Sequence, residues 1–493
     1  MESRLASKGR MIEYHCPKHV ASHLSKFHSK LKIMAKKARK IKSEQGLKLK
    51  IVNPNAAGID VADGELQVCV PEDRDGDNNR RFTSFTADLR VIAAWLKACR
   101  IDTVAMEATG VYWVNIFFFL QDEGFDVILA NPSQVKNYYG KKTDVADAEW
   151  LMLLHSYGLI KASYNPDSWA RRVRTLARHR SALIKSASTE TMHMQKAMEL
   201  MNIKLATVIS DIQGQSGTAI INAILQGNHD PVALAQLASS RCKASKETIA
   251  LSLEGTWDED QLFMLRQSKE LYDFYQKKIM ECDEKIQDII SKYADIVKED
   301  TTEIKKAKKC KGHNNPLTFD VEKYACAIWG TNVMCIPGVN EDCVLTAFGE
   351  LGYNFTEKFD TAAKFCKWLN LTPNNKISGG KLLSSKMPKR KNIMGQAFRM
   401  SGNACSKQHN ELGNYFRRIQ ARDGYAQAIV ATAHKIAIIF YTMVRNKTQY
   451  NPYLVGDDEK TILERKLKRT QKQLDRLNKL HDGFKKGTAK LVD

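Results

Sequence analysis

The segment from residue 53 to 165 constrains the fold of this chain most, because short strand patterns and helical patterns follow one another there in a fixed order. The predicted strands are 56–61, 66–70, 81–85, 103–107 and 126–130. The first three strands follow one another without a helix, whereas helices with one apolar face are predicted after the third, fourth and fifth. This order predicts a mixed sheet covered by helices in an α/β domain.

Acidic residues lie at the ends of these predicted elements. Asp60 ends the first strand, Glu107 ends the fourth, and Asp144 and Asp147 open the helix after the fifth. If the first and fourth strands are neighbours, the four carboxylates converge at one edge of the sheet. Each acid alone is also explained as a strand end or a helix start that suits the helix dipole. All four in this order predict a site for two Mg²⁺ ions about 4 Å apart, with Mn²⁺ as an alternative ion.

The charge of the chain indicates a polyanionic partner. The formal net charge is +21, and residues 1–50 hold 14 Lys or Arg against three Glu. A basic arm over residues 1–52 favours nucleic acid as the partner. The alternatives are that it binds a membrane surface or that its charge only keeps the protein in solution. The start of the chain lacks a signal-peptide core, and no apolar run of bilayer length is evident, the richest being 114–120. We therefore expect a cytoplasmic, nucleoid-associated protein without a membrane partner.

Eleven cysteines are scattered through the chain, which is typical of small buried residues in a reducing compartment. The nearest approaches to a metal cluster are His15 and Cys16 with His19, and Cys310 with His313. Neither group has a matching second half at zinc-site spacing.

Beyond residue 165 the chain is mainly helical. We expect a coiled-coil region at 166–300, a linker at 301–330, a helical domain at 331–455 and a basic amphipathic tail at 456–493. A softer helical insert is expected between 214 and 254, and upstream helical segments around Leu176 and Leu183 offer a partner for the coil. The coil is predicted from apolar residues at alternating steps of four and three, namely Tyr275, Ile279, Cys282, Ile286, Ile289, Tyr293 and Ile296.

Four motifs of the first domain form a combination that is specific to one protein family. They are Gly58-Ile59-Asp60-Val61, Glu107-Ala108-Thr109-Gly110-Val111-Tyr112, Asn131-Pro132 and Lys142-Thr143-Asp144-Val145-Ala146-Asp147-Ala148. In combination they resemble the insertion-sequence-110 family of bacterial transposases, DEDD enzymes with a RuvC-like, ribonuclease H-like domain. The resemblance implies that Asp60, Glu107, Asp144 and Asp147 are the catalytic, metal-binding acids. Lys141 and Lys142 beside them are expected to contact nucleic acid.

The resemblance extends to the C-terminal half. The segment 335–340 resembles a helix-hairpin-helix, in which Gly338 and Asn340 would offer backbone N–H groups to a phosphate. Asn340 stands where a second Gly is usual, and Asn tolerates a left-handed conformation.

The family's serine nucleophile matches Ser378, followed by Gly379 and Gly380, and Ser384 and Ser385 are its competitors. The cations expected to contact phosphates around it are Lys376, Lys381, Lys389 and Arg390.

The resemblance implies a Mg²⁺-dependent transposase whose serine forms a covalent DNA intermediate, with donor and target DNA, a guide (bridge) RNA and a dimeric to tetrameric assembly. Two alternatives stay open. A RuvC-like endonuclease acting on branched DNA would need the acids but not Ser378, and a transposase-derived binding protein would need neither.

Overall fold

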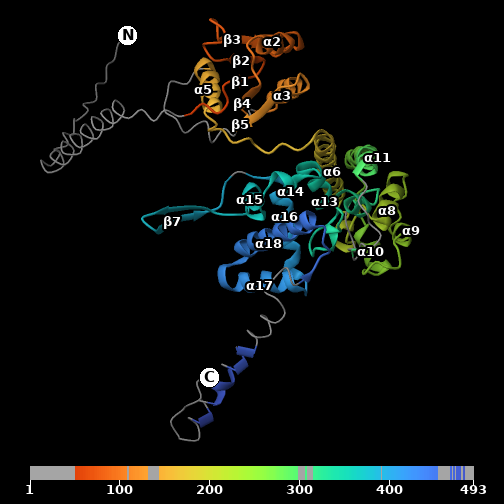
Figure 1. Ribbon diagram of the computed structural model, residues 1–493. Coiled ribbons are helices and arrows are strands. Elements are labelled where there is room, and N and C mark those ends of the chain that lie inside the picture. The colour runs from red at the N-terminus through yellow and green to blue at the C-terminus, as the bar shows by residue number, and fades with distance from the viewer. Residues whose placement is uncertain are drawn as a thin grey trace, which may run out of the picture. The chain divides into compact units, whose positions relative to one another are not determined.

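A computed structural model describes residues 50–107, 110–130, 144–297, 306–307, 315–389 and 391–452, and part of 467–482. The chain divides into two compact units, Met1–Tyr164 and Asn165–Asp493 (Figure 1). Several predicted features lie outside the described residues, namely the arm up to residue 49 with its histidines and Cys16, the linker residues 308–314 with Cys310 and His313, and most of the tail.

A five-stranded mixed sheet forms the centre of the first unit. Its strands are β1 (Ala56–Val61), β2 (Glu65–Cys69), β3 (Asn79–Thr83), β4 (Thr103–Glu107) and β5 (Asp126–Ala130). The strand order is β3-β2-β1-β4-β5, with β1 antiparallel to β2 and parallel to β4. The mixed sheet is therefore confirmed, and the first and fourth strands are neighbours as the convergence of the acids requires.

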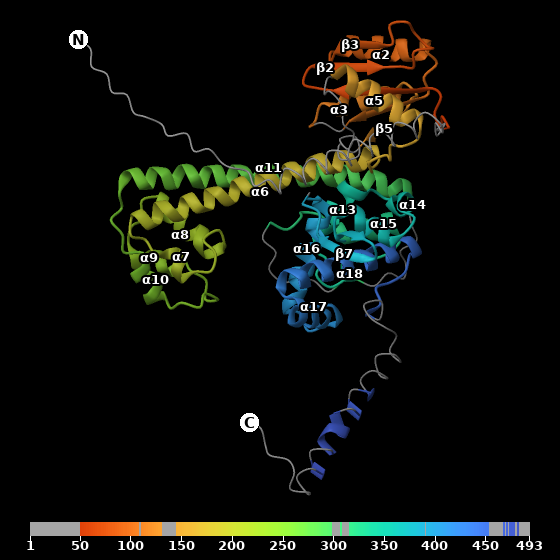
Figure 2. The same cartoon turned by 90° about the vertical axis from the view of Figure 1, so that its left-hand side faces the viewer.

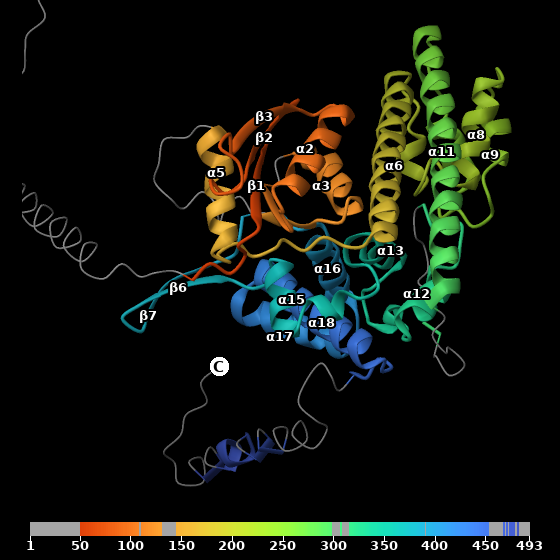
Figure 3. The ribbon, with the colours of Figure 1, turned by 45° about the horizontal axis from the view of Figure 1, so that its top comes forward.

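Helices cover both faces of this sheet (Figure 3). One face carries α2 (Thr86–Ala98) and α3 (Trp113–Asp122), which bury Ile59 of β1 and Met106 of β4. The opposite face carries α5 (Asp144–Ser156), which packs on small residues such as Ala105. Large apolar residues thus form the core on one face, while small residues let α5 lie close to the other.

Two long helices, α6 (Ser168–Leu200) and α11 (Glu259–Val297), pack side by side in the second unit (Figure 2). Trp169 near the start of α6 stacks on Tyr293 near the end of α11, with ring centroids 4.1 Å apart, so the helices run antiparallel. The predicted seam is buried at its centre, whereas Ile296 is 80% exposed and does not belong to it. The predicted upstream partner of the coil is confirmed as α6.

The far end of this coil carries a small helical bundle with its own apolar core. Its helices are α7 (Leu205–Val208), α8 (Gln215–Leu225), α9 (Pro231–Gln236) and α10 (Lys246–Ser252). Ile220, Ile221, Leu234 and Ile249 meet in this core. The softer insert predicted at 214–254 is thus part of a packed element.

The rest of the second unit is mainly helical, as predicted. Its elements are α12 (Val321–Trp329), η1 (Val333–Cys335), α13 (Glu341–Leu351), α14 (Phe355–Lys358), α15 (Ala362–Trp368), β6 (Asn374–Ser378), β7 (Lys381–Lys386), α16 (Ile393–Ala404), η2 (Cys405–Lys407), α17 (Glu411–Asp423) and α18 (Tyr425–Asn446). Fully buried aromatic rings hold them together, among them Phe355, Phe365 and Phe440, whose centroids lie 5.2 to 6.0 Å apart in contacting pairs.

The helix α18 is long and apolar enough to cross a membrane by length and composition. The sequence interpretation overlooked it, because it took 114–120 as the richest apolar run. Ile436, Ala437 and Phe440 of α18 are fully buried inside the unit. The helix is therefore explained as the core helix of the C-terminal domain, and no membrane is indicated.

A buried ion pair joins the coil to the C-terminal elements. Arg180 of α6 donates from Nε to Asp283 Oδ1 of α11 at 2.5 Å, and the two side chains are 2% and 0% exposed. Arg180 Nη2 also donates to the carbonyl oxygens of Asn315 and Pro316, while Thr318 N donates to Asp283 Oδ2. These extra hydrogen bonds offset the cost of taking two charges out of water.

Removing one partner of this pair should be strongly destabilising, because the other buried charge then loses its closest partner. We expect Arg180→Ala or Asp283→Ala to lower the free energy of unfolding by about 3 to 5 kcal/mol in chemical denaturation. The double variant Arg180→Met/Asp283→Leu should recover most of the loss.

The control is Arg422→Ala, which breaks the exposed Arg422–Asp423 pair and should change stability little. Equal effects of Arg180→Ala and Arg422→Ala would contradict the role of the buried pair.

Candidate active site

Gly58 in the middle of β1 brings the helix α5 onto the sheet. A Cβ atom at this position would lie 2.3 Å from the Ala148 carbonyl oxygen and 2.4 Å from the Met152 nitrogen. No real side chain fits there, so only Gly lets the two backbones touch. A Gly inside a strand often marks a place where another backbone approaches closely. Gly58 could therefore have indicated this contact from the sequence alone.

Asp60 and Glu107 lie on the α5 side of the sheet. In the parallel β1–β4 pair, Ile59 is opposite Met106, and Asp60 and Glu107 come directly after these two residues. Ile59 and Met106 belong to the core on the α2 and α3 side. Since side chains alternate between faces along a strand, the two acids project from the face that α5 covers.

The first turns of α5 hold the other two acids. Asp144 begins the helix, and Asp147 lies in its first turn, next to the Ala148 that contacts Gly58. Asp147 is half-buried like Asp60 and Glu107, while the side chain of Asp144 lies outside the described atoms. The backbone thus brings β1, β4 and the start of α5 to one face of the sheet.

A chain of hydrogen bonds holds the start of α5 beside β1. Gln67 is paired with Asp60 across the β1–β2 ladder, and its side chain donates to Asn79 Oδ1 at 2.7 Å. Asn79 Nδ2 in turn donates to the carbonyl oxygen of Val145 at 3.0 Å. Gln67 and Asn79 are positioning residues that sequence reasoning missed, because their contacts depend on strand register.

A cavity of about 240 Å³ opens at this place. Asp60 from β1 and Val145 from α5 both line it, together with Gln67 and the ion-paired Glu65 and Arg81. Among the side chains that the structure describes, no three His, Cys, Asp or Glu are close enough to enclose a metal ion. The backbone therefore brings the acids to one face, and Asp60 among them lines the opening. Their oxygen donors suit a hard divalent cation, but the described atoms do not form a closed cage.

Two titratable groups stay neutral near pH 7, namely Cys69 of β2 beside α5 and His155 within α5. Burial, with smaller contributions from Glu149 and Glu72, raises the pKa of Cys69 to about 12. Burial lowers the pKa of His155, whose Nε2 lies 2.8 Å from the Thr103 hydroxyl at the start of β4. Both therefore serve packing and positioning. The nine described cysteines are free thiols and mostly buried, as predicted.

Ser378, the predicted nucleophile, is the last residue of β6 in the two-stranded hairpin β6–β7. It pairs with Lys381 across Gly379 and Gly380, whose φ values of 53° and 74° define a two-residue type I′ turn. Within the described part of the chain, no residue forms a hydrogen bond with its hydroxyl group. The serine is exposed at the tip of the hairpin, in a different compact unit from the acids.

Its competitors are placed differently. Ser385 donates a hydrogen bond to Asn375 Oδ1 at 2.8 Å across the hairpin, and Ser384 is half-buried in the middle of β7. Lys376, Lys381 and Lys389 are exposed; Lys381 pairs with Ser378 across the hairpin, whereas Lys389 lies beyond the end of β7. The remaining predicted cations, Lys141, Lys142 and Arg390, lie outside the described residues, as do Ala108, Thr109, Asn131 and Pro132.

The segment 335–340 has a structural explanation of its own. Gly338 has φ of 87°, and a Cβ there would lie 2.3 Å from the Ser401 carbonyl oxygen of α16. Asn340 is extended, with φ of −124°, and its side chain accepts from Cys343 N to cap α13. The expected left-handed conformation of Asn340 is therefore wrong, because this residue is an N-cap.

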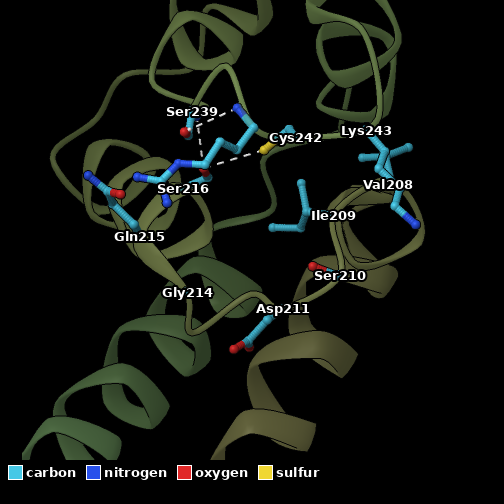
Figure 4. A pocket seen from close by; sticks show the side chains of 11 residues that line it. Val208, Ile209, Ser210, Asp211, Gly214, Gln215, Ser216, Ser239, Cys242 and Lys243 are labelled. Carbon is cyan, nitrogen blue, oxygen red and sulfur yellow. Dashed lines mark hydrogen bonds between the residues drawn. The ribbon is translucent and has the colours of Figure 1, made fainter. Parts of the chain in front are cut away.

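A larger cavity of about 370 Å³ lies in the insert (Figure 4). Ser216 at the start of α8 accepts from Ser239 N and contacts Cys242 Sγ, and Asp211, Arg241 and Lys243 are also among the lining residues. These contacts satisfy the serine locally and include no grouping of acids. The opening beside Asp60 is therefore the better candidate for chemistry.

Substituting Gly58 should separate α5 from β1. We expect Gly58→Ala to lower the free energy of unfolding by about 1 to 3 kcal/mol, the usual cost of overpacking. Hydrogen exchange of α5, followed by mass spectrometry, should accelerate. The matched control is Gly76→Ala, because a Cβ there meets nothing within 4 Å. Equal stability and exchange in the two variants would contradict the close contact.

Comparison with known proteins agrees with this arrangement. Residues 57–203, which include the sheet and α5, match a family model of DEDD transposases of the IS110 type, described as Transposase. Residues 330–415, which include the Ser378 hairpin, match a model described as Transposase IS116/IS110/IS902 family. A search of curated proteins finds no match. The chain belongs to the insertion-sequence-110 (IS110) family of DEDD transposases, enzymes that cut and rearrange DNA.

Proposed function

We propose that this transposase cleaves and exchanges DNA strands with Asp60, Glu107, Asp144 and Asp147 as one catalytic group and Ser378 as the nucleophile. The observation that carries the proposal is the common face of the sheet on which β1, β4 and the start of α5 place the acids. A single acid at a strand end is explained by the local structure. Several acids on one face of the sheet favour a shared chemical role.

The four acids would hold divalent cations, with Mg²⁺ as the proposed ion, Mn²⁺ as its substitute, and two ions as the proposed number. Such ions activate an attacking oxygen and stabilise the leaving oxygen in phosphoryl transfer. The residues of the chain orient the site: Gly58 holds α5 on β1, and Gln67 and Asn79 fix the first turn of α5 beside Asp60.

Ser378 is suited to attack DNA because the type I′ turn leaves its hydroxyl exposed at the hairpin tip. In the proposed step its Oγ loses a proton and bonds to a DNA phosphorus, while the bond from that phosphorus to a sugar oxygen breaks. The sugar leaves as a hydroxyl group, and the strand stays attached to the protein for exchange.

Within the described residues, Ser378 has no hydrogen-bonded base. The proposal therefore requires the acids to activate it, and we infer that a neighbouring subunit supplies them in a dimeric to tetrameric assembly.

Donor and target DNA are the proposed substrates, joined by a guide RNA. The support from charge is the excess of +21, which favours polyanionic partners. Gly338 and Asn340 are the less supported part of the proposed nucleic-acid contacts, because their conformations are explained by packing on α16 and by capping of α13.

A trapped covalent complex tests the nucleophile. Incubation of the wild-type protein with element DNA, guide RNA and Mg²⁺, followed by denaturation, should leave DNA attached to protein. Ser378→Ala should abolish the adduct, and the control Ser385→Ala should retain it, because Ser385 bonds to Asn375 instead. Free nicked product from Ser378→Ala would favour a nuclease, and a wild-type protein that binds without cleaving would favour a binding protein.

The acids are tested separately by Asp147→Asn, which keeps the shape of the side chain and removes its charge. We expect cleavage to fall by about 100-fold or more, the scale on which single groups stabilise charge in a transition state. Circular dichroism should be unchanged, since Asp147 is half-buried at a helix start. Full Mg²⁺-dependent cleavage by this variant would remove Asp147 from the site.

A further inference from the structure

The hairpin β6–β7 belongs to a segment with an unusual charge. Between Asp360 and Glu411 the chain contains no Asp or Glu, while Lys and Arg recur throughout. The lysines on the hairpin strands are Lys376, Lys381 and Lys386, and all three are exposed. A ribbon with cations and no anions favours a polyanion, and it disfavours a second copy of this chain with net charge +21.

The hairpin stands alone as a two-stranded ribbon. Among the strands that the structure describes, β6 and β7 pair only with each other, and every residue of the two except the half-buried Ser384 is exposed. Figures 1 and 3 show it projecting away from the helices α15 and α16 beside it. Two-stranded hairpins are marginally stable in water by themselves, so a partner that covers this ribbon would stabilise it.

Apolar side chains gather at the tip of this ribbon. Ile377, Leu382 and Leu383 are 65%, 57% and 68% exposed. Ile377 and Leu382 form a cross-strand pair directly next to the pair of Ser378 and Lys381. Because neighbouring pairs face opposite sides of a ribbon, the apolar pair and the serine project from opposite faces of the same tip.

We propose that this ribbon enters a groove of the DNA duplex, where Ile377 and Leu382 wedge against the bases beside the phosphate that Ser378 attacks. The proposal rests on the proposed function of Ser378 and adds a group that distorts the DNA. A two-stranded ribbon fits the major groove of B-DNA, and inserted apolar side chains unstack and kink base steps.

The lysines of the ribbon lie along both strands, where they can reach phosphates on either side of a groove. The wedge and the cations therefore have separate roles: the lysines supply affinity, and the apolar pair supplies distortion. Because Ser378 projects from the opposite face of the tip, the proposed kink has to bend the strand around the tip to bring the reacting phosphate to the serine.

Fluorescence of 2-aminopurine tests the wedge. Element-end duplexes carrying 2-aminopurine beside the cleaved phosphate are mixed with protein and guide RNA, and both binding and fluorescence are measured. Binding of the wild-type protein should raise the fluorescence several-fold. The variant Ile377→Thr/Leu382→Thr keeps strand-forming residues in the ribbon and should bind within about tenfold of wild type while losing the rise.

The matched control is Val232→Thr/Leu251→Thr, which removes two exposed apolar residues from the insert and should leave both signals unchanged. A full rise in fluorescence with the hairpin variant overturns the wedge, and the Ser378-dependent adduct then shows that the proposed function stands without it. Loss of oligomers by that variant in light scattering, with the rise retained, would assign the tip to contact with a second copy. A wild-type protein that binds no DNA would overturn both proposals.

Discussion

The candidate site depends on one missing atom, the Cβ of residue 58. Because Gly58 has no side chain, the backbone of α5 lies against β1, and Asp144 and Asp147 begin that helix on the face to which Asp60 and Glu107 project. Most large apolar residues of the sheet pack on the other face, against α2 and α3, while Ile128 of β5 packs on the α5 side. One face thus supplies the stability of the domain, and the other is free to place polar groups at its edge.

Much of the first unit could be predicted from the sequence, because local patterns determine it. The strands at 56–61, 103–107 and 126–130 agree with β1, β4 and β5 residue for residue, since each is a short apolar run between turns. The neighbouring position of β1 and β4 was only a condition for the convergence of the acids, and the strand order meets it. Asn79 could not be predicted, because its bond to Val145 depends on the register of β2 against β3.

The second unit shows where local patterns fail. Ile296 continues the heptad spacing of α11, but it is exposed, because the spacing says nothing of where the packing partner ends. Asn340 was interpreted by analogy with a glycine, whereas its side chain caps α13. Ser378 was found through resemblance alone. The glycines after it are consistent with the turn, but only the structure shows that this turn joins the strands of an exposed two-stranded ribbon.

The bonds of Arg180 also bear on how the second unit can move. Arg180 holds α6, Asp283 of α11 and the carbonyl oxygens of Asn315 and Pro316 at one point. The two helices, of 33 and 39 residues, extend roughly 50 to 60 Å at 1.5 Å per residue. The ion pair lies in the first half of α6, and the insert lies at the far end of the coil, beyond the end of α6. A partner that binds the insert would therefore act on the segment at Asn315 and Pro316 through the two helices and this ion pair.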